Sequence, residues 1–217
     1  MLNFSIDTGR APRVLFIGAH CDDIEIGCGG TVMQLLRQRP DAEVLWVVLS
    51  SNEERAREAR RSAAKLLAGV RRKRVEIRDF RESYFPAQMA GIKDYFGEVR
   101  RMLDPDIVFA HYRDDLHQDH RVVGELVWNT FRNHPILEYE IPKYDGGMGA
   151  PAVFHELPVR VVERKIRLLM QAFPSQAGKA WFTPDTFRGI MRIRGIECNA
   201  PEGFAEAFYA RKVCFRW

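Results

Sequence analysis

Short apolar runs alternate along the chain with longer segments in which apolar residues recur every three or four positions. Four runs have the length and the β-branched content of buried strands: residues 14–17, 44–49, 75–80 and 107–110. Four longer segments have the spacing of amphipathic helices: residues 31–39, 51–67, 92–103 and 119–132. Ser51 or Asn52 is expected to cap the second of these helices. The pattern therefore predicts repeated strand–helix units.

This alternation predicts an α/β fold, because each helix carries the chain back so that the next strand lies parallel to the last. We expect a Rossmann-like three-layer sandwich, with a mainly parallel sheet flanked by helices. Two later strands, at residues 137–141 and 153–157, have no helix between them. They either extend the sheet at one edge or form an excursion from it. The glycine-rich segment between them, residues 142–149, predicts a mobile loop.

The remaining sequence shows no boundary that would mark a second domain. A helix is expected at residues 159–172, another at residues 185–193, and a closing strand at residues 207–215. No internal repeat, low-complexity tract or linker interrupts this order, and 217 residues suit one α/β domain. We therefore expect a single domain over residues 1–217.

Composition narrows the class of protein. Hydrophobic residues make up 46% of the chain and charged residues 29%, which is the balance of a folded globular protein rather than a disordered one. No uninterrupted apolar run of about 18 residues occurs, so no membrane span is expected. The N-terminus lacks the pattern of a signal peptide, and the four cysteines form no paired framework. The cytoplasm is the expected location.

The charge pattern argues against a nucleic-acid-binding protein. The net charge of +4 is mildly basic, and the Lys and Arg residues are scattered along the chain. The dense run from Arg71 to Arg74 is interpreted as a solvated turn before a strand. A mildly positive protein suits an anionic small-molecule substrate such as a sugar nucleotide.

Metal-binding side chains follow two of the predicted strands. His20, Asp22 and Asp23 come just after the first strand. Residues 111–120, after the fourth strand, contain three histidines and three aspartates. Because the carboxyl ends of parallel strands meet at one edge of a sheet, we expect the two loops to converge where open α/β sheets bind ligands.

These side chains match the needs of a catalytic zinc site, which takes about three nitrogen or oxygen ligands and keeps one position open. His20, one carboxylate of the Asp22–Asp23 pair and a histidine of the second loop would form a His₂Asp set. Adjacent carboxylates do not readily bind one tetrahedral ion together, so one would bind the metal while the other accepts a proton from water. A Lewis acid beside a general base is what hydrolysis of an unactivated amide needs.

Other interpretations of nearby residues stay open. His111 either lines the pocket or packs beneath it. A metal site that includes Cys21 or Cys28 is an alternative to the His₂Asp set. The glycines at positions 27, 29 and 30 are interpreted as packing positions that let a helix approach the sheet, with phosphate binding at the helix N-terminus as the alternative.

At the two clusters the sequence resembles the LmbE/PIG-L-like family of zinc-dependent N-deacetylases. The family's AHPDD-type motif appears as AHCDD at residues 19–23, and its HxDH motif as HQDH at residues 117–120. Weaker matches are the Arg-x-x-Glu at residues 55–58 and the Ser-Gln pair at residues 175–176. The usual proline of the first motif is Cys21 here, a change that removes no ligand.

The resemblance implies the metal ligands and the base. His20, Asp23 and His120 would bind one Zn²⁺ per chain, with other divalent ions as alternatives. Asp22 would be the general base that accepts a proton from water.

The resemblance also implies supporting roles. His117 would assist as an acid or an oxyanion stabiliser, and Asp119 would be the electrostatic partner of His117 or of His120. Asp115 would orient a metal ligand from behind. Arg55 would contact the substrate, with a surface salt bridge within its helix as the alternative.

The activity implied by the resemblance is that of a metal-dependent amide hydrolase acting on C–N bonds other than peptide bonds. We expect removal of an N-acetyl group from an amino-sugar-containing small molecule: a glycoside, a sugar nucleotide or an antibiotic precursor. The first alternative is a zinc amidase for a non-sugar amide or a thiol conjugate, and the second is a non-catalytic Rossmann-like module that binds a metal or a ligand. Family members often form trimers or hexamers, so a homo-oligomer is an open expectation.

Overall fold

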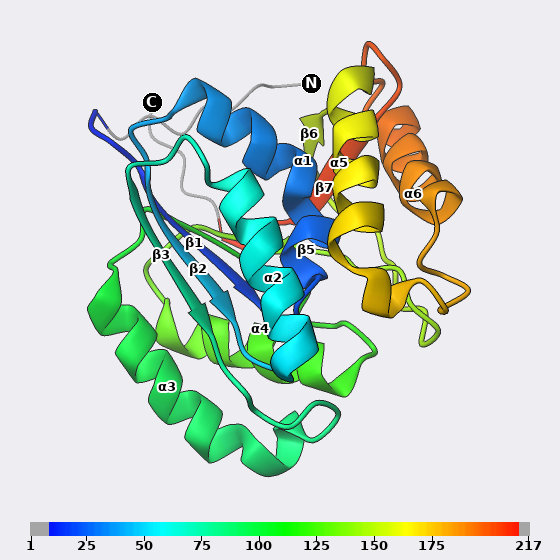
Figure 1. The fold of residues 1–217 in the computed structure, drawn as a ribbon. Coiled ribbons are helices and arrows are strands. Elements are labelled where there is room, and N and C mark those ends of the chain that lie inside the picture. The colour runs from blue at the N-terminus through cyan, green and yellow to red at the C-terminus, as the bar shows by residue number, and fades with distance from the viewer. Residues whose placement is uncertain (1–8, 213–217) are drawn as a thin grey trace.

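The computed structural model describes residues 9–212, which form a seven-stranded sheet with helices on both faces (Figure 1). The strands are β1 (Arg13–Gly18), β2 (Glu43–Val48), β3 (Arg72–Ile77), β4 (Ile107–His111), β5 (Ile136–Tyr139), β6 (Val153–Glu156) and β7 (Ala205–Tyr209). The helices are α1 (Asp23–Gln38), α2 (Glu53–Leu66), α3 (Met89–Met102), α4 (Gln118–Thr130), α5 (Val159–Ala172) and α6 (Pro184–Glu197), with short 3₁₀ turns η1 (Phe85–Gln88) and η2 (Pro174–Gln176).

The expected α/β class with a mainly parallel sheet is confirmed. The strand order is β3-β2-β1-β4-β5-β7-β6, and the first five strands in that order run parallel. The two late strands extend one edge of the sheet, which was the first of the two expectations. They are not neighbours, however, because β7 lies between them and runs antiparallel to both β5 and β6.

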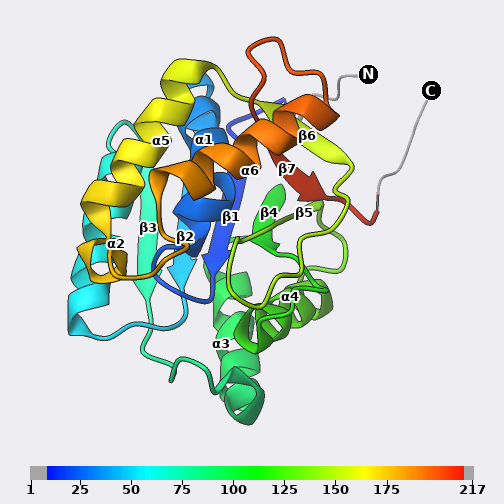
Figure 2. The same cartoon turned by 90° about the vertical axis from the view of Figure 1, so that its right-hand side faces the viewer.

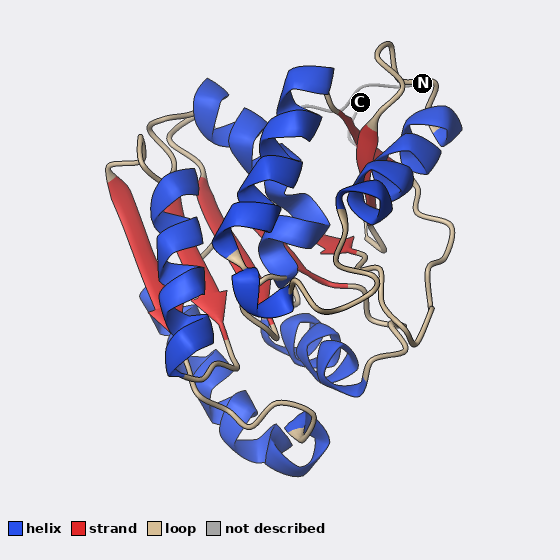
Figure 3. Ribbon diagram, turned by 45° about the vertical axis from the view of Figure 1, so that its right-hand side comes forward, coloured by secondary structure: helices blue, strands red, loops and turns tan. Residues whose placement is uncertain are grey.

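Side chains that alternate along β1 divide the core into two halves. Val14 and Phe16 belong to the cluster that packs under α1, α2, α5 and α6. Leu15 and Ile17 belong to the cluster under α3 and α4 on the opposite face (Figures 2 and 3). Because β1 is covered on both faces, all four positions are apolar and fully buried.

The glycine-rich segment after β1 is helical, so the helix predicted from residue 31 begins eight residues earlier. The helix α1 begins at Asp23 and is kinked at Cys28, where φ is −143°. The interpretation of the glycines as packing positions is supported. A Cβ on Gly27 would lie 2.2 Å from the ring of Tyr139, and one on Gly30 would lie 2.8 Å from Leu157.

A buried ion pair stabilises the kink in α1. The break frees the backbone N–H groups of Gly30 and Thr31, and both donate to the carboxylate of Glu206 on β7 at 2.7 Å. Lys165 of α5 donates to the same carboxylate at 2.6 Å and to the carbonyl oxygen of Ile26 at 2.6 Å. These N–H groups already have an anionic partner, so the phosphate alternative is not supported.

Two of the boundaries that differ from the prediction concern the third strand and the closing strand. The strand β3 begins at Arg72, so most of the basic run lies in an edge strand rather than in a turn, although its side chains are exposed as expected. Charged side chains on an edge strand discourage pairing with another chain. The strand β7 ends at Tyr209. The predicted end of the closing strand at residue 215, and the N-terminal residues 1–8 without a signal-peptide pattern, lie outside the described residues.

Within residues 9–212, no helix combines the length and the apolar character needed to span a bilayer.

The substitution Gly27→Ala tests the close packing of α1 against β5. In an exposed helix this change stabilises by about 1 kcal/mol. Here the new Cβ would overlap the fully buried ring of Tyr139, so we expect a loss of about 1–3 kcal/mol in the free energy of unfolding, measured by urea denaturation. Gly189→Ala in α6 is the control, because a Cβ there meets nothing within 4 Å. Equal stability of the two variants would contradict the packing argument.

Candidate metal centre

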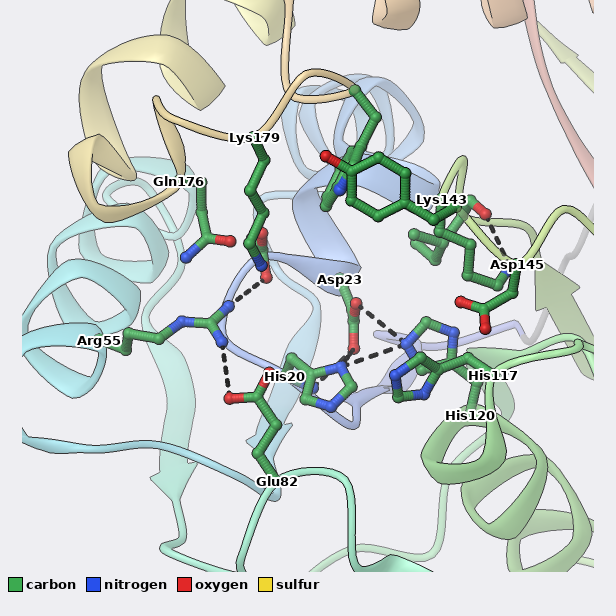
Figure 4. A pocket seen from close by; sticks show the side chains of 14 residues that line it. His20, Asp23, Arg55, Glu82, His117, His120, Lys143, Asp145, Gln176 and Lys179 are labelled. Carbon is green, nitrogen blue, oxygen red and sulfur yellow. Dashed lines mark hydrogen bonds and ion pairs between the residues drawn. The ribbon is translucent and has the colours of Figure 1, made fainter.

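The two loops that were expected to converge follow β1 and β4, which are neighbours in the sheet. From β1 the sheet continues through β2 and β3, and from β4 it continues through β5. Open α/β sheets bind ligands at such a switch point, because the connections leave it in opposite directions. Figure 4 shows His20 and Asp23 from the first loop facing His117 and His120 from the start of α4.

Three residues in this cluster supply donor atoms at the spacing of ligands on one ion, with a different carboxylate oxygen of Asp23 facing each histidine. Nδ1 of His20 lies 3.2 Å from Nε2 of His120 and 3.4 Å from Oδ2 of Asp23. Oδ1 of Asp23 lies 3.6 Å from Nε2 of His120. Ligand atoms about 2.0–2.1 Å from a tetrahedral zinc ion lie roughly 3.3 Å from one another. The side chains as placed therefore fit a divalent ion.

Two other groups of donors lie within 4.8 Å of one another: His20 with His117 and His120, and Asp23 with His111 and His120. His111 does not line the pocket. Its ring is fully buried, and its Nε2 lies 2.9 Å from the backbone N–H of Ala19, which donates to it. His111 is thus a packed residue beneath the site, the second of its two interpretations.

The cysteines lie apart from the donor set. The thiol of Cys21 donates to the carbonyl oxygen of Ser50 at 3.3 Å, and burial raises its pKa to about 12. The thiol of Cys28 donates to the carbonyl oxygen of Ile24, and burial raises its pKa well above the usual value. Neither thiol belongs to a group of donors close enough to share one ion within the described residues, so the alternative with a cysteine ligand is not supported.

Asp115 lies behind one of the proposed ligands. Its Oδ2 lies 3.2 Å from Nδ1 of His120 and 2.8 Å from Nζ of Lys143. Burial opposes the charged form, but the contacts with His120 and Lys143 outweigh it and lower the pKa of Asp115 to about 2. A carboxylate on the far nitrogen orients the ring and directs the near nitrogen at the metal.

Asp119 lies behind His20, the other proposed histidine ligand. The expected partner of Asp119 was His117 or His120. Oδ2 of Asp119 lies 3.2 Å from Nε2 of His20, not from His117 or His120. The same carboxylate accepts the backbone N–H groups of Ser83 and Phe85 at 2.6 and 3.1 Å. The segment before η1 folds over the start of α4, and this contact turns Asp119 toward the first loop.

The buried carboxylates make a positive charge favourable at His20. Burial alone would lower the pKa of His20, but Asp23 and Asp119 outweigh it and raise the pKa to about 10. Burial alone would likewise raise the pKa of Asp23, but the surrounding histidines hold it well below its usual range. A divalent cation at the same donors would satisfy the same carboxylates and would displace the proton of His20.

The position of His117 at the start of α4 determines which of its ring nitrogens carries the proton. As the N-cap residue of α4, its Nδ1 accepts the backbone N–H of Asp119 at 3.3 Å. Burial, with a further contribution from the charge of His20, lowers the pKa of His117, so the ring is neutral at pH 7. A neutral ring that accepts through Nδ1 carries its proton on Nε2. His117 therefore offers one N–H donor to the pocket it lines.

Asp22, the residue next to the proposed ligand Asp23, forms an ion pair with Arg55. Nη2 of Arg55 lies 2.7 Å from Oδ1 of Asp22, and Nη1 lies 3.2 Å from Glu82. Burial raises the pKa of Asp22, while the charge of Arg55 opposes that rise. The alternative of a surface salt bridge within the helix is wrong, because Arg55 is only 8% exposed and both partners lie outside α2. Asn52 fixes the start of that helix by accepting the N–H of Arg55.

A cavity of about 170 Å³ opens over these residues. Several of its lining residues were not predicted from the sequence as site residues: Glu82, Ile141, Lys143, Tyr144, Asp145, Gln176, Lys179 and Trp181. Most come from the loop after β5 and from the segment after η2. The hydroxyl of Tyr144 accepts the backbone N–H of Ala180 at 3.2 Å and so joins these two segments. Lys143, Tyr144 and Asp145 lie together in a glycine-rich loop, and this sequence pattern could have indicated that the loop lines a binding site.

The chain is similar in sequence or in fold to several known proteins. Residues 15–131 match the family described as PIG-L: GlcNAc-PI de-N-acetylase. The N,N'-diacetylchitobiose deacetylase from Pyrococcus horikoshii is 23% identical, with a TM-score of 0.71 over 93% of this chain and 84% of that chain. GalB, the 4-carboxy-2-hydroxymuconate hydratase from Pseudomonas putida, is 17% identical, with a TM-score of 0.72 over 95% and 99%. A zinc-inhibited form of teicoplanin deacetylase is 15% identical, with a TM-score of 0.65 over 91% and 97%. These structures share the fold with this chain.

Metal binding at pH 7 is expected to release about one proton, because His20 is protonated in the metal-free protein and must be neutral to bind an ion. Affinity should accordingly rise with pH until the pH approaches the His20 pKa of about 10. Calorimetric titration in buffers of different ionisation enthalpy measures the number of protons. His134→Gln, at a histidine outside the pocket, should behave as wild type. Release of no proton would contradict protonation of His20 in the metal-free protein.

Proposed function

The chain belongs to the PIG-L family of de-N-acetylases, and from this premise we propose that it removes an N-acetyl group from an amino-sugar-containing small molecule with one bound zinc ion. It is an amide hydrolase of the deacetylase class. The observation that carries the proposal is the spacing of His20, Asp23 and His120 beside a carboxylate and a neutral histidine in one cavity.

The proposed substrate class draws on both the pocket and the relatives. One structural relative is named for deacetylation of N,N'-diacetylchitobiose and another for deacetylation of teicoplanin. The cavity is lined by the aromatic rings of Tyr144 and Trp181 together with several charged side chains. Two aromatic rings in a lining that is otherwise mostly polar and charged suit a small polar ligand such as a sugar. Lys143 and Lys179 also suit an anionic group on that sugar.

His20, Asp23 and His120 would hold the ion. When bound, a divalent ion supplies Lewis-acid chemistry that polarises the amide carbonyl and acidifies water. Asp22 accepts a proton from the attacking water and passes it to the nitrogen as the C–N bond breaks, which yields acetate and a free amine. The ion pair with Arg55 engages Oδ1 of Asp22, so we assign the proton transfer to Oδ2.

His117 stabilises the negative charge that develops on the carbonyl oxygen. Its neutral ring has one proton, and the N-cap contact with Asp119 directs that proton to Nε2. A fixed donor aimed at a developing oxyanion lowers the barrier without reorganisation. Arg55 lies in the cavity wall, and we propose that it contacts the substrate as well as Asp22.

Two alternative functions were left open by the sequence, and family membership argues against only one of them. Membership of a hydrolase family argues against the non-catalytic binding module. A zinc amidase for a non-sugar amide or thiol conjugate has the same catalytic groups and differs only in the substrate. Zinc itself, a homo-oligomeric assembly, a single domain and a cytoplasmic location stay predictions.

A substrate screen tests the proposal directly. Free amine should appear with N-acetylated amino sugars, including chitobiose derivatives and sugar nucleotides, and should require metal restored to chelated protein. Zinc, cobalt and manganese should be compared, since one relative is described in a zinc-inhibited form. Turnover of non-sugar amides alone would favour the first alternative. Inactivity of fully metallated protein on every amide would reject the proposal.

Asp22→Asn should keep the metal and lose turnover. The variant leaves all three proposed ligands in place but removes the proton acceptor, so kcat should fall by about 10²–10⁴-fold. Metal content by plasma spectrometry and kcat by amine detection separate the two effects. Asp114→Asn, at a carboxylate paired with Arg211, is the control and should keep wild-type kcat. Turnover near normal in Asp22→Asn would remove Asp22 as the base.

A further inference from the structure

Five cationic side chains gather on the outer surface of the layer formed by α1, α2 and α5, which lie on the same face of the sheet (Figures 1 and 3). They are Arg37, Lys65, Arg160, Arg164 and Arg167. These side chains line two hollows of about 450 Å³ each, and the hollows adjoin because both include Met33, Arg164 and Arg167. The two hollows together are called the cationic groove below.

The protein offsets the positive charge of the groove only in part, through the attraction between Glu163 and Arg167. Within residues 9–212, none of the five cations has a hydrogen bond or an ion pair. Glu163 is the acidic residue of the groove, and it is paired with Arg188 at 2.7 Å. Arg160, Arg164 and Arg167 follow one another at helical spacings of four and three, where like charges repel. The groove therefore concentrates positive charge at a cost in stability that an anionic ligand would offset.

This groove is separate from the metal centre. The residues that line the cavity over His20 and those that line the groove do not overlap. The helix α1 begins at Asp23 beside the metal centre, whereas Met33 and Arg37 lie in its last two turns. At 1.5 Å per residue, the groove lies about 15–20 Å along the helix from Asp23. Its cations therefore lie outside the cavity that covers the proposed ligands.

We propose that the cationic groove is a second binding site, for a ligand that carries several phosphate groups. Guanidinium groups bind phosphate oxygens in pairs of parallel hydrogen bonds, and four of the five cations are arginines. Each hollow has the volume of a small-molecule site. Leu66 and Leu168 with Met33 form an apolar floor for the rest of the ligand.

The lining also distinguishes among anions. No aromatic side chain lines either hollow, so single-stranded nucleic acid would find no ring on which to stack its bases. A free oligophosphate and a phosphorylated lipid headgroup share the chemistry that the groove recognises. Binding of tripolyphosphate and binding to lipid vesicles, measured separately, distinguish these two sources.

Calorimetric titration of the metal-loaded enzyme with tripolyphosphate tests the site. The variant Arg164→Gln with Arg167→Gln should bind at least about tenfold more weakly, and wild-type affinity should fall as salt increases. Both side chains are exposed, so the variant should fold and should deacetylate small substrates at the wild-type rate. Arg100→Gln with Arg101→Gln, on α3 across the sheet, removes the same charge and should bind as wild type.

A second arm measures sedimentation with phosphatidylcholine vesicles that contain phosphatidylinositol bisphosphate, whose headgroup carries several phosphates. Sedimentation that the groove variant loses would support the proposal and identify a lipid headgroup as the source. Three results would overturn the proposal: equal weakening in both double variants, tripolyphosphate binding that survives in the groove variant but disappears on chelation of the metal, or groove-dependent binding to duplex DNA alone.

Discussion

The candidate metal centre contains buried negative charge that only a cation can balance. Asp22, Asp23 and Asp119 are each at most 3% exposed, and burying an unpaired carboxylate costs several kcal/mol. The protein meets this cost in two ways. Arg55 balances Asp22, and the ring of His20 lies between Asp23 and Asp119. A divalent ion at the same donors would provide the balance that the protonated histidine provides without it.

The position of these charges is set by packing remote from the cavity. The helix α1 starts at Asp23, so its placement on the sheet decides where that carboxylate points. Gly27 lets the helix approach Tyr139, whose hydroxyl donates to the carbonyl oxygen of Ile17 in β1. Beyond the kink, the Lys165–Glu206 pair joins the helix to α5 and β7. The late strand and helix thus support a site that they do not enter.

Scattered charge in a sequence becomes ordered charge in a fold. The Lys and Arg residues show little clustering along the chain, which argued against a nucleic-acid-binding protein. Folding nevertheless places Arg37, Lys65 and three arginines of α5 around one groove. Other cations line the metal-centre cavity, where Arg55 and Lys143 contact carboxylates. The net charge of +4 therefore does not predict where cationic side chains gather on the folded surface.

The sequence alone determined the alternation of strands and helices and the two motif loops, because hydrophobic period and motif spacing are local properties. Parallel strands bring their carboxyl ends to one edge, so the convergence of His20 with His120 was also predictable. Only the tertiary structure decided the insertion of β7, the pairing of Arg55 with Asp22, and the contact of Asp119 with His20. Each joins segments distant in the chain, and which side chains meet there depends on the packing of every element between them.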